Sequence, residues 1–234
     1  MIKTRVELKS YLRAECDVSR NKLIRRFLGR PIDYGCKEVV SIRRFLKVYR
    51  KYEYYYNQGA LCFIPRNLYR VLFAYFSSKL NIVLPINGVG KGLTLWHTYK
   101  SQTMVAGQVG RNVTIRPGVI LANQGQWRKK DACPLVEDFV EFSFGVKAFG
   151  PIRIGRGSLI CANTVLYCNV PPYSIVAGNP GKVVGFVKTP SQVVEFEKKE
   201  YPANERIPLE ELVSNYKTYF LDRTDEISKY IGLV

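Results

Sequence analysis

The sequence contains a single histidine, His97, among 234 residues, and only two methionines and two tryptophans. It has no uncharged apolar run of about 20 residues, the length that a membrane-spanning helix needs, so no spanning helix is expected. Its first residues, MIKTRVELKS, lack the apolar core of a secretory signal, so we expect a cytoplasmic protein. The six cysteines show no CxxC or other paired spacing, which predicts reduced thiols rather than a disulfide framework.

Acidic residues are scarce as well: 19 Asp and Glu stand against 36 Lys and Arg, and the formal net charge is +17. The imbalance is concentrated in residues 1–80, which hold 18 basic and 6 acidic residues, a net of +12. Such a block, interleaved with tyrosines, suits either a solvated basic surface or peripheral contact with the inner face of a membrane. No zinc finger, RNP pattern or basic zipper accompanies the charge, so nucleic acid is not an expected partner.

Composition divides the chain into three regions. Residues 1–80 are rich in Arg, Leu, Phe and Tyr at three- and four-residue spacings, which predicts a helical N-terminal region. Residues 81–187 change to Val, Ile and Gly with short polar intervals. Residues 188–234 return to helical spacing and predict a helical tail, in which the charged segment 195–200 is expected to be solvated.

A six-residue period organises the middle region. Its first positions are Val109, Ile115, Leu121, Val136, Phe142, Ala148, Ile154, Ile160 and Leu166. Its fifth positions are Val113, Val119, Val140, Val146, Ile152, Ser158, Thr164 and Val170. Six residues of α-helix rotate by about 600°, so this period keeps no helical face, and the hairpin signals of antiparallel strands are missing. A parallel β-helix explains the period, because three six-residue sides form one triangular coil with aliphatic side chains stacked inward.

Two interruptions of the period predict loops. Leu95 and Val109 are 14 residues apart, and Leu121 and Val136 are 15 apart. Because loops on a rigid scaffold commonly carry functional sites, we expect a site in the insertion that begins at His97 and in residues 122–134. The segment VPPYSIVAGNPGKVVG follows the last unit, and its two prolines are expected to terminate the coil because they cannot donate to another ladder.

Three segments resemble the hexapeptide-repeat acyltransferases: VGKGLTLWHT, VGRNVTIRPGVILANQGQ and the terminal VPPYSIVAGNPGKVVG. The resemblance implies a left-handed parallel β-helix, acetyl-CoA as co-substrate and a homotrimer. VGKGLTLWHT is similar to the serine acetyltransferase stretch that carries the catalytic histidine, which falls on His97. The basic, Tyr-rich N-terminus and the LPIN at 84–87 resemble the branch found in capsule, exopolysaccharide and lipopolysaccharide gene clusters.

Three positions depart from the serine enzymes. The resemblance places Trp96 where those enzymes bind the serine amine with Asp, Cys133 where they have a second active-site His, and Ile82 where an Asp pairs with the catalytic His. A Trp beside the base suits the apolar face of a sugar ring, so we expect O-acetylation of a saccharide hydroxyl in surface-polysaccharide assembly. Two alternatives stay open: a serine O-acetyltransferase of cysteine biosynthesis, and an inactive trimeric β-helix scaffold.

Acetyl transfer to a hydroxyl needs a base for the proton and donors for the oxyanion. We expect His97 to be the base, with Trp96, Asp131 and Cys133 at the acceptor pocket and an oxyanion donor within residues 122–124. The acceptor that orients His97 is left open among Asn81, Asn87, Asp131 and a backbone carbonyl.

The resemblance also implies where coenzyme A is held. The matching positions are Ala122, Asn123, Ser143, Gly145, Ala162, Ala177, Gly178 and Lys182. Lys182 is expected to meet the 3′-phosphate as a point charge. No metal is expected, because the zinc of β-helix carbonic anhydrases takes three His ligands and each chain here has one.

Overall fold

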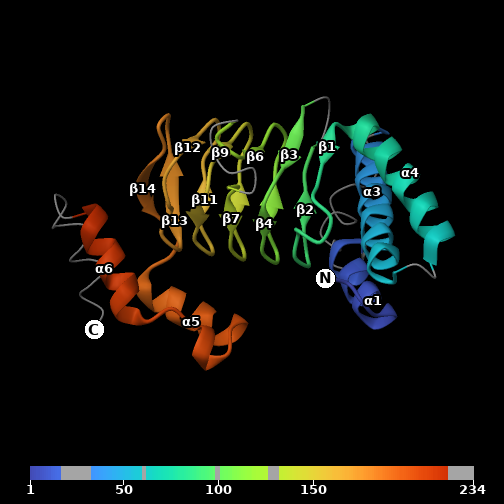
Figure 1. The fold of residues 1–234 in the computed structure, drawn as a ribbon. Helices are drawn as coiled ribbons and strands as arrows, with labels where there is room; N and C mark the ends of the chain where they lie inside the picture. Colours follow the sequence, from blue (N-terminus) through green and yellow to red (C-terminus); the bar gives the residue numbers. More distant parts are fainter. Residues whose placement is uncertain (17–32, 60–61, 98–100, 126–131, 221–234) are drawn as a thin grey trace.

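The computed structural model describes residues 1–16, 33–59, 62–97, 101–125 and 132–220. It shows a left-handed parallel β-helix with helices at both ends of the chain, as the sequence predicts (Figure 1). None of the helices in these ranges is both long and apolar enough to span a membrane.

The coil has three sides of parallel strands. Side A consists of β1 (Ile82–Val83), β3 (Thr103–Val105), β6 (Ile120–Ala122), β9 (Lys147–Phe149) and β12 (Val165–Leu166). Side B consists of β4 (Gln108–Val109), β7 (Leu135–Val136) and β10 (Arg153–Ile154). Side C consists of β2 (Thr94–Leu95), β5 (Thr114–Ile115), β8 (Glu141–Phe142), β11 (Leu159–Ile160), β13 (Ser174–Ala177) and β14 (Lys182–Phe186).

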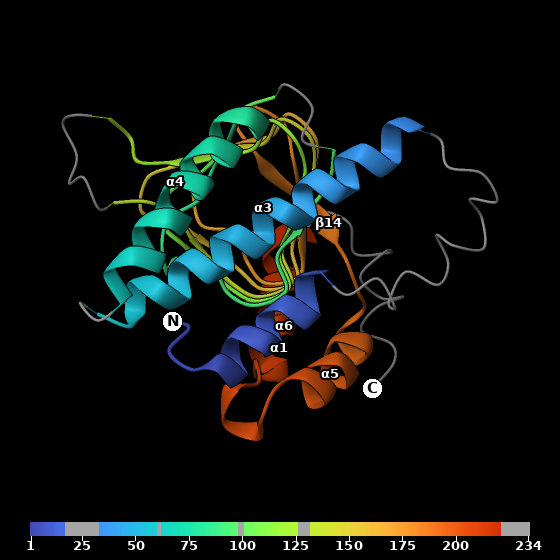
Figure 2. The ribbon, with the colours of Figure 1, turned by 90° about the vertical axis from the view of Figure 1, so that its right-hand side faces the viewer.

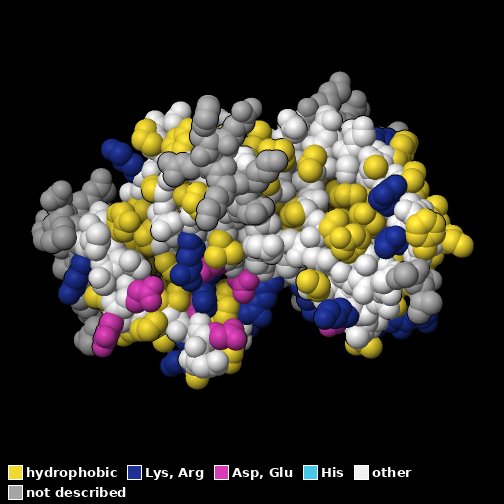
Figure 3. All heavy atoms as spheres, viewed as in Figure 1, with side chains coloured by type: hydrophobic (Ala, Val, Ile, Leu, Met, Phe, Trp, Pro, Cys, Tyr) yellow, Lys and Arg dark blue, Asp and Glu magenta, His cyan; other side chains and the backbone are white. Residues whose placement is uncertain are grey.

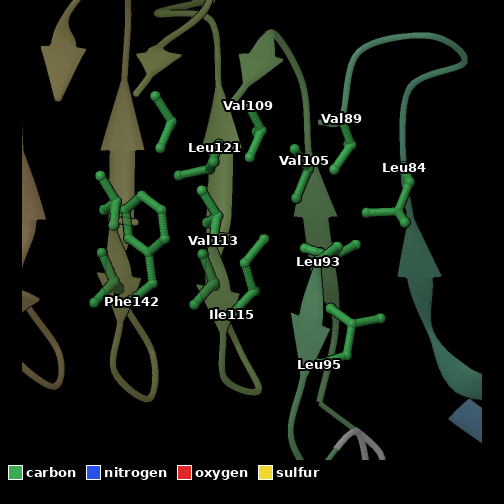
Figure 4. Packing of buried hydrophobic residues seen from close by; sticks show 14 of the residues in the cluster. Leu84, Val89, Leu93, Leu95, Val105, Val109, Val113, Ile115, Leu121 and Phe142 are labelled. Carbon is green, nitrogen blue, oxygen red and sulfur yellow. The ribbon is translucent and has the colours of Figure 1, made fainter. Parts of the chain in front are cut away.

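The predicted period describes the core of the coil. Every first- and fifth-position residue from Val109 to Val170 is buried, with an exposed fraction of 5% or less. Figure 4 shows side chains such as Val113, Ile115 and Leu121 pointing into the space that the coil encloses. Each Val, Leu, Ile or Phe buried in this way stabilises the fold by about 1.5–3 kcal/mol.

Sharp corners between sides B and C use residues with left-handed backbone. Each stands three positions after an inward residue of side B: Gly92, Asn112, Phe139, Gly157 and Tyr173, with φ between 55° and 86°. Gly and Asn adopt this conformation readily, whereas a bulky side chain is an outlier there. Phe139 and Tyr173 are held in it by aromatic packing against Phe196 of the C-terminal region.

The predicted extent of the first loop is wrong. Thr103–Val105 forms β3, which pairs with β1 and β6, so the first insertion is confined to the segment between β2 and β3. The six-residue period does not reveal this strand. Its inward residue, Val105, stands ten residues after Leu95 and four before Val109, and neither spacing is a multiple of six. The second interruption does lie between two strands, β6 and β7.

The prediction that Pro171 and Pro172 terminate the coil is also wrong. β13 follows them and pairs in parallel with β11, and β14 then turns back antiparallel to β13. In the preceding coil the Gly155 N–H donates forward to the Val170 carbonyl. Pro171 occupies the equivalent position of the last coil, which has no following coil to receive such a bond. The prolines therefore mark the last coil rather than its end.

Helices α1 (Arg5–Cys16), α3 (Asp33–Asn57) and α4 (Phe63–Leu80) cover the first coil. Seen along the coil, α3 and α4 cross its open end (Figure 2). Aromatic rings join the two helices, with Phe73 at 5.7 Å from Phe45 and 5.5 Å from Tyr49. The Tyr49 hydroxyl donates to the Pro85 carbonyl at 2.7 Å, which fixes α3 to the entry of the β-helix.

The C-terminal region forms α5 (Pro190–Glu200), a short 3₁₀ helix (Ala203–Glu205) and α6 (Leu209–Phe220). A capping box at Thr189 and Gln192 starts α5. The expectation that segment 195–200 is solvated fails at Glu197, which is 2% exposed. Its carboxylate accepts hydrogen bonds from the Tyr173 hydroxyl and the Arg156 guanidinium, so it attaches α5 to the coil.

Candidate functional site

His97 lies where the chain leaves the coil after β2. In later coils the left-handed corner residue between sides C and A stands three positions after the inward residue, as Gly145 does after Phe142. His97 has φ 47° and stands only two positions after Leu95. This uncommon backbone for a non-glycine residue redirects the chain out of the coil and leaves the imidazole exposed at its edge.

Trp96, the residue before His97, is hydrogen-bonded to the next coil. Its N–H donates to the Ile115 carbonyl at 3.2 Å, and its side chain is 44% exposed. The rings of Trp96 and His97 have centroids 6.0 Å apart and planes tilted by 39°. An apolar face therefore lies directly beside the imidazole.

Most predicted coenzyme A positions share this edge of the coil. The register of side C aligns Leu95, Ile115, Phe142, Ile160 and Val176, one in each coil. The edge row, as we call it, is the set of residues that follow them toward side A. The predicted residues that belong to it are Trp96, His97, Ser143, Gly145, Ala162, Ala177 and Gly178. Neighbouring strands lie about 4.8 Å apart, so the edge row forms a continuous strip along the coil. Lys182 pairs in register with Ala177 at the far end of the strip.

The remaining predicted residues lie on a different edge, between sides A and B. Ala122 ends β6, Asn123 follows it, and Cys133 lies shortly before β7. A Cβ placed on Gly107 would come within 3.0 Å of the Cys133 Cβ, so the coil and the second insertion are in close contact there. The side A strands separate this edge from His97 within one chain. Asp131 lies outside the described residues.

Arg116 is a candidate that the sequence reasoning missed. It follows Ile115 as Trp96 follows Leu95, which places it in the edge row one coil from Trp96. Its guanidinium pairs with the Glu141 carboxylate at 2.5 Å and lies 5.8 Å from the centre of the Phe144 ring. The side chain is 37% exposed, so the solvent reaches this ion pair at the edge row. Its position one residue after an inward side C residue is the signal that could have identified it.

Asn87 and Asn81 have structural partners. The side-chain amides of Asn87 and Asn57 exchange two hydrogen bonds of 2.8 and 2.9 Å. Asn81 is the C-cap of α4, and its carbonyl accepts the Thr103 N–H at 2.9 Å. Across the described part of the chain, no group of three or more His, Cys, Asp or Glu side chains is arranged to hold a metal ion.

Comparisons with known proteins find serine acetyltransferases, both by sequence and by structure. No protein-family model matches the chain. It is 31% identical over 134 residues to serine acetyltransferase 4 of Arabidopsis thaliana. The aligned region covers 56% of this chain and 38% of that protein. It is 30% identical over 142 residues to the serine acetyltransferase of Escherichia coli, covering 60% and 50%. The chain thus spans about a third to a half of the length of the curated relatives it matches.

Solved structures agree in fold. The serine acetyltransferase of Neisseria gonorrhoeae matches with a TM-score of 0.56 and 25% identity over 79% of this chain and 67% of that one. The serine acetyltransferase of Brucella abortus, solved in complex with coenzyme A, matches with a TM-score of 0.54 and 25% identity over 77% and 67%. Fold and similarity together support the hexapeptide-repeat acyltransferase superfamily as the class of this chain. Within that class, all four of these relatives are named serine acetyltransferase.

The predicted saccharide acceptor is therefore wrong. Sequence similarity over 134 and 142 residues connects the chain to serine acetyltransferases, which favours the alternative of serine O-acetylation. The saccharide prediction rested on Trp96 and Cys133, and the loss of two side chains from one pocket does not identify a different acceptor. The assignment to the capsule and exopolysaccharide branch gains no support from these similarities.

Proposed function

We propose that this chain is an acetyl-CoA-dependent serine O-acetyltransferase in which His97 is the general base. The observation that carries the proposal is the position of the chain's one histidine, exposed at the head of the edge row in a fold shared with serine acetyltransferases.

In this proposal His97 takes the proton of the serine hydroxyl as that oxygen attacks the thioester carbonyl. The attack forms the new C–O bond and turns the carbonyl oxygen into the oxyanion of a tetrahedral intermediate. Its collapse breaks the C–S bond, and the imidazolium gives its proton to the departing thiolate of coenzyme A. Backbone N–H groups near residues 122–124 supply the oxyanion donors. The edge row holds the pantetheine arm, and Lys182 meets the 3′-phosphate.

The two edges that carry the candidate residues favour a homotrimer. Ala122, Asn123 and Cys133 are separated from His97 by side A within one chain, so a complete site needs a second subunit whose other edge approaches His97. The Brucella abortus enzyme, which shares the fold, was solved with coenzyme A, which supports coenzyme A as the ligand of the edge row.

Serine recognition then depends on residues other than those of the serine enzymes. Ile82 is fully buried in the core, so its position offers no carboxylate to His97. The face of Trp96 can receive the serine ammonium by a cation–π contact. We propose that Arg116, one coil away, binds the serine carboxylate, for which its guanidinium shares or exchanges its ion pair with Glu141.

The test is product formation with a matched acceptor series. L-Serine, ethanolamine and 3-hydroxypropionate are each incubated with acetyl-CoA, and acetylated products are identified by mass spectrometry. The proposal predicts O-acetylserine and little product from the two acceptors that lack the carboxylate or the amine. Equal turnover of all three would contradict serine specificity, and no turnover of any would favour the scaffold alternative.

A further inference from the structure

One face of α4 carries a stripe of large apolar side chains that the solvent reaches. Ile64, Leu68, Val71 and Tyr75 are 79%, 56%, 63% and 58% exposed. Their spacings of four, three and four residues place them on a single helical face. Phe63, 59% exposed, extends the stripe at its N-terminal end. We call these five residues the α4 stripe.

The α4 stripe is not the face that attaches α4 to the protein. Phe73, on the opposite side of the helix, makes that attachment, with ring centres 5.7 Å from Phe45 and 5.7 Å from Tyr52. No residue of α4 is fully buried, so the helix has apolar side chains on both faces and only one of them is covered. A contiguous exposed apolar patch of this kind marks an interaction surface.

The charge around the α4 stripe is positive. α4 contains Arg66, Arg70 and Lys79 and no acidic residue. Two of the six carboxylates of residues 1–80, Glu15 and Glu53, are buried against Arg50 and do not offset the charge at the surface. Figure 3 shows hydrophobic side chains with Lys and Arg among them over this helical end of the molecule.

We propose that the α4 stripe binds the surface of a membrane that contains anionic lipid. Apolar side chains would enter the boundary between headgroups and acyl chains, while the basic side chains meet lipid phosphates. Charge favours this occupant over a second copy of the chain, because contact between two α4 stripes would bring two groups of Arg and Lys together without a neutralising carboxylate. The proposal is independent of the acetyl-transfer reaction.

The test is co-sedimentation of the full chain with vesicles of phosphatidylcholine alone and of phosphatidylcholine mixed with phosphatidylglycerol. Leu68→Gln/Val71→Gln removes the centre of the α4 stripe while keeping good helix formers. Leu209→Gln, at an exposed apolar position of α6 that is 49% accessible, is the matched control. Circular dichroism and the molar mass in solution are measured for each variant.

We expect the wild type and Leu209→Gln to bind the anionic vesicles, and to bind them more weakly as salt is raised. The double variant should bind roughly tenfold to hundredfold more weakly. Absence of binding to anionic vesicles, or equal binding by the double variant, would overturn the proposal. A fall in the molar mass of the double variant without lipid would also overturn it, because a second copy would then cover the stripe.

Discussion

The guanidinium of Arg50 and the carboxylate of Glu15 form an ion pair that is wholly enclosed by protein. The Arg50 Nη2 lies 2.6 Å from the Glu15 Oε1, and both side chains are 0% exposed. The pair joins α3 to α1, and it reaches the first coil because Arg50 also donates to the Val89 and Gly90 carbonyls at 2.9 and 2.6 Å. Glu15 in turn accepts the N–H groups of Gly92 and Leu93. This network closes the open end of the β-helix just before the strand that leads to His97.

Arg50→Met should lower the free energy of unfolding by roughly 3–5 kcal/mol, because Glu15 and Glu53 are left charged and buried without their partner. Arg153→Met is the control, since Arg153 is 66% exposed in its pair with Glu137 and should cost under about 1 kcal/mol. Chemical denaturation at equal protein concentration measures both. Adding Glu15→Gln to Arg50→Met should recover part of the loss. Equal effects of the two arginine substitutions would show that the buried network does not hold the end of the coil.

The cysteines should differ in reactivity with their burial. Burial disfavours the thiolate and raises the pKa of Cys16 to about 11. At pH 8 roughly 0.1% of such a thiol is ionised, so Cys16 should resist alkylation in the folded protein. Cys168 is exposed and should react faster than Cys16. Timed iodoacetamide labelling followed by peptide mass spectrometry measures both sites, and rapid labelling of Cys16 would contradict the packing of α1 on α3.

The attachment of α5 to the coil should fail at alkaline pH. Burial and the adjacent Glu197 carboxylate raise the pKa of Tyr173 above its ordinary value of 10. Because the folded-state pKa is raised, this contribution to stability is fully present below about pH 10 and is lost as the pH rises toward the folded-state value. The tyrosinate absorbance, compared between the wild type and Tyr173→Phe, measures the titration. Ionisation of Tyr173 at its ordinary pKa with α5 still protected from proteolysis would refute the expectation.

The inward residues of the coil could be predicted because each packs on its equivalent in the next coil, so one period repeats. β3 could not, since the insertion before it changes the spacing of Val105 from its neighbours. Pro171 shows a second limit: a missing N–H signals the last coil, but the sequence does not show which strands that coil still contains.

Charged residues were the least predictable. Arg50 belongs to the basic N-terminal block that the sequence suggests is at the surface, yet it is fully buried. Glu197 sits in a charged segment and is buried as well. Their burial depends on partners 35 and 24 positions away, Glu15 and Tyr173, which no local pattern connects to them. His97 could be predicted from its motif, and Arg116 could have been found from its position one residue after the inward Ile115.

The most direct test of the account replaces His97 with Asn. Asn accepts the left-handed backbone at this position, so His97→Asn removes the base while keeping the corner. Thiol release from acetyl-CoA with L-serine is compared between the wild type and His97→Asn, after circular dichroism and coenzyme A binding are shown to be equal. If His97 is the general base, the rate should fall by about 10²- to 10⁴-fold while the affinity for coenzyme A is retained. Serine-dependent release by His97→Asn within about threefold of the wild type, far short of the loss expected for removal of a general base, would contradict that role.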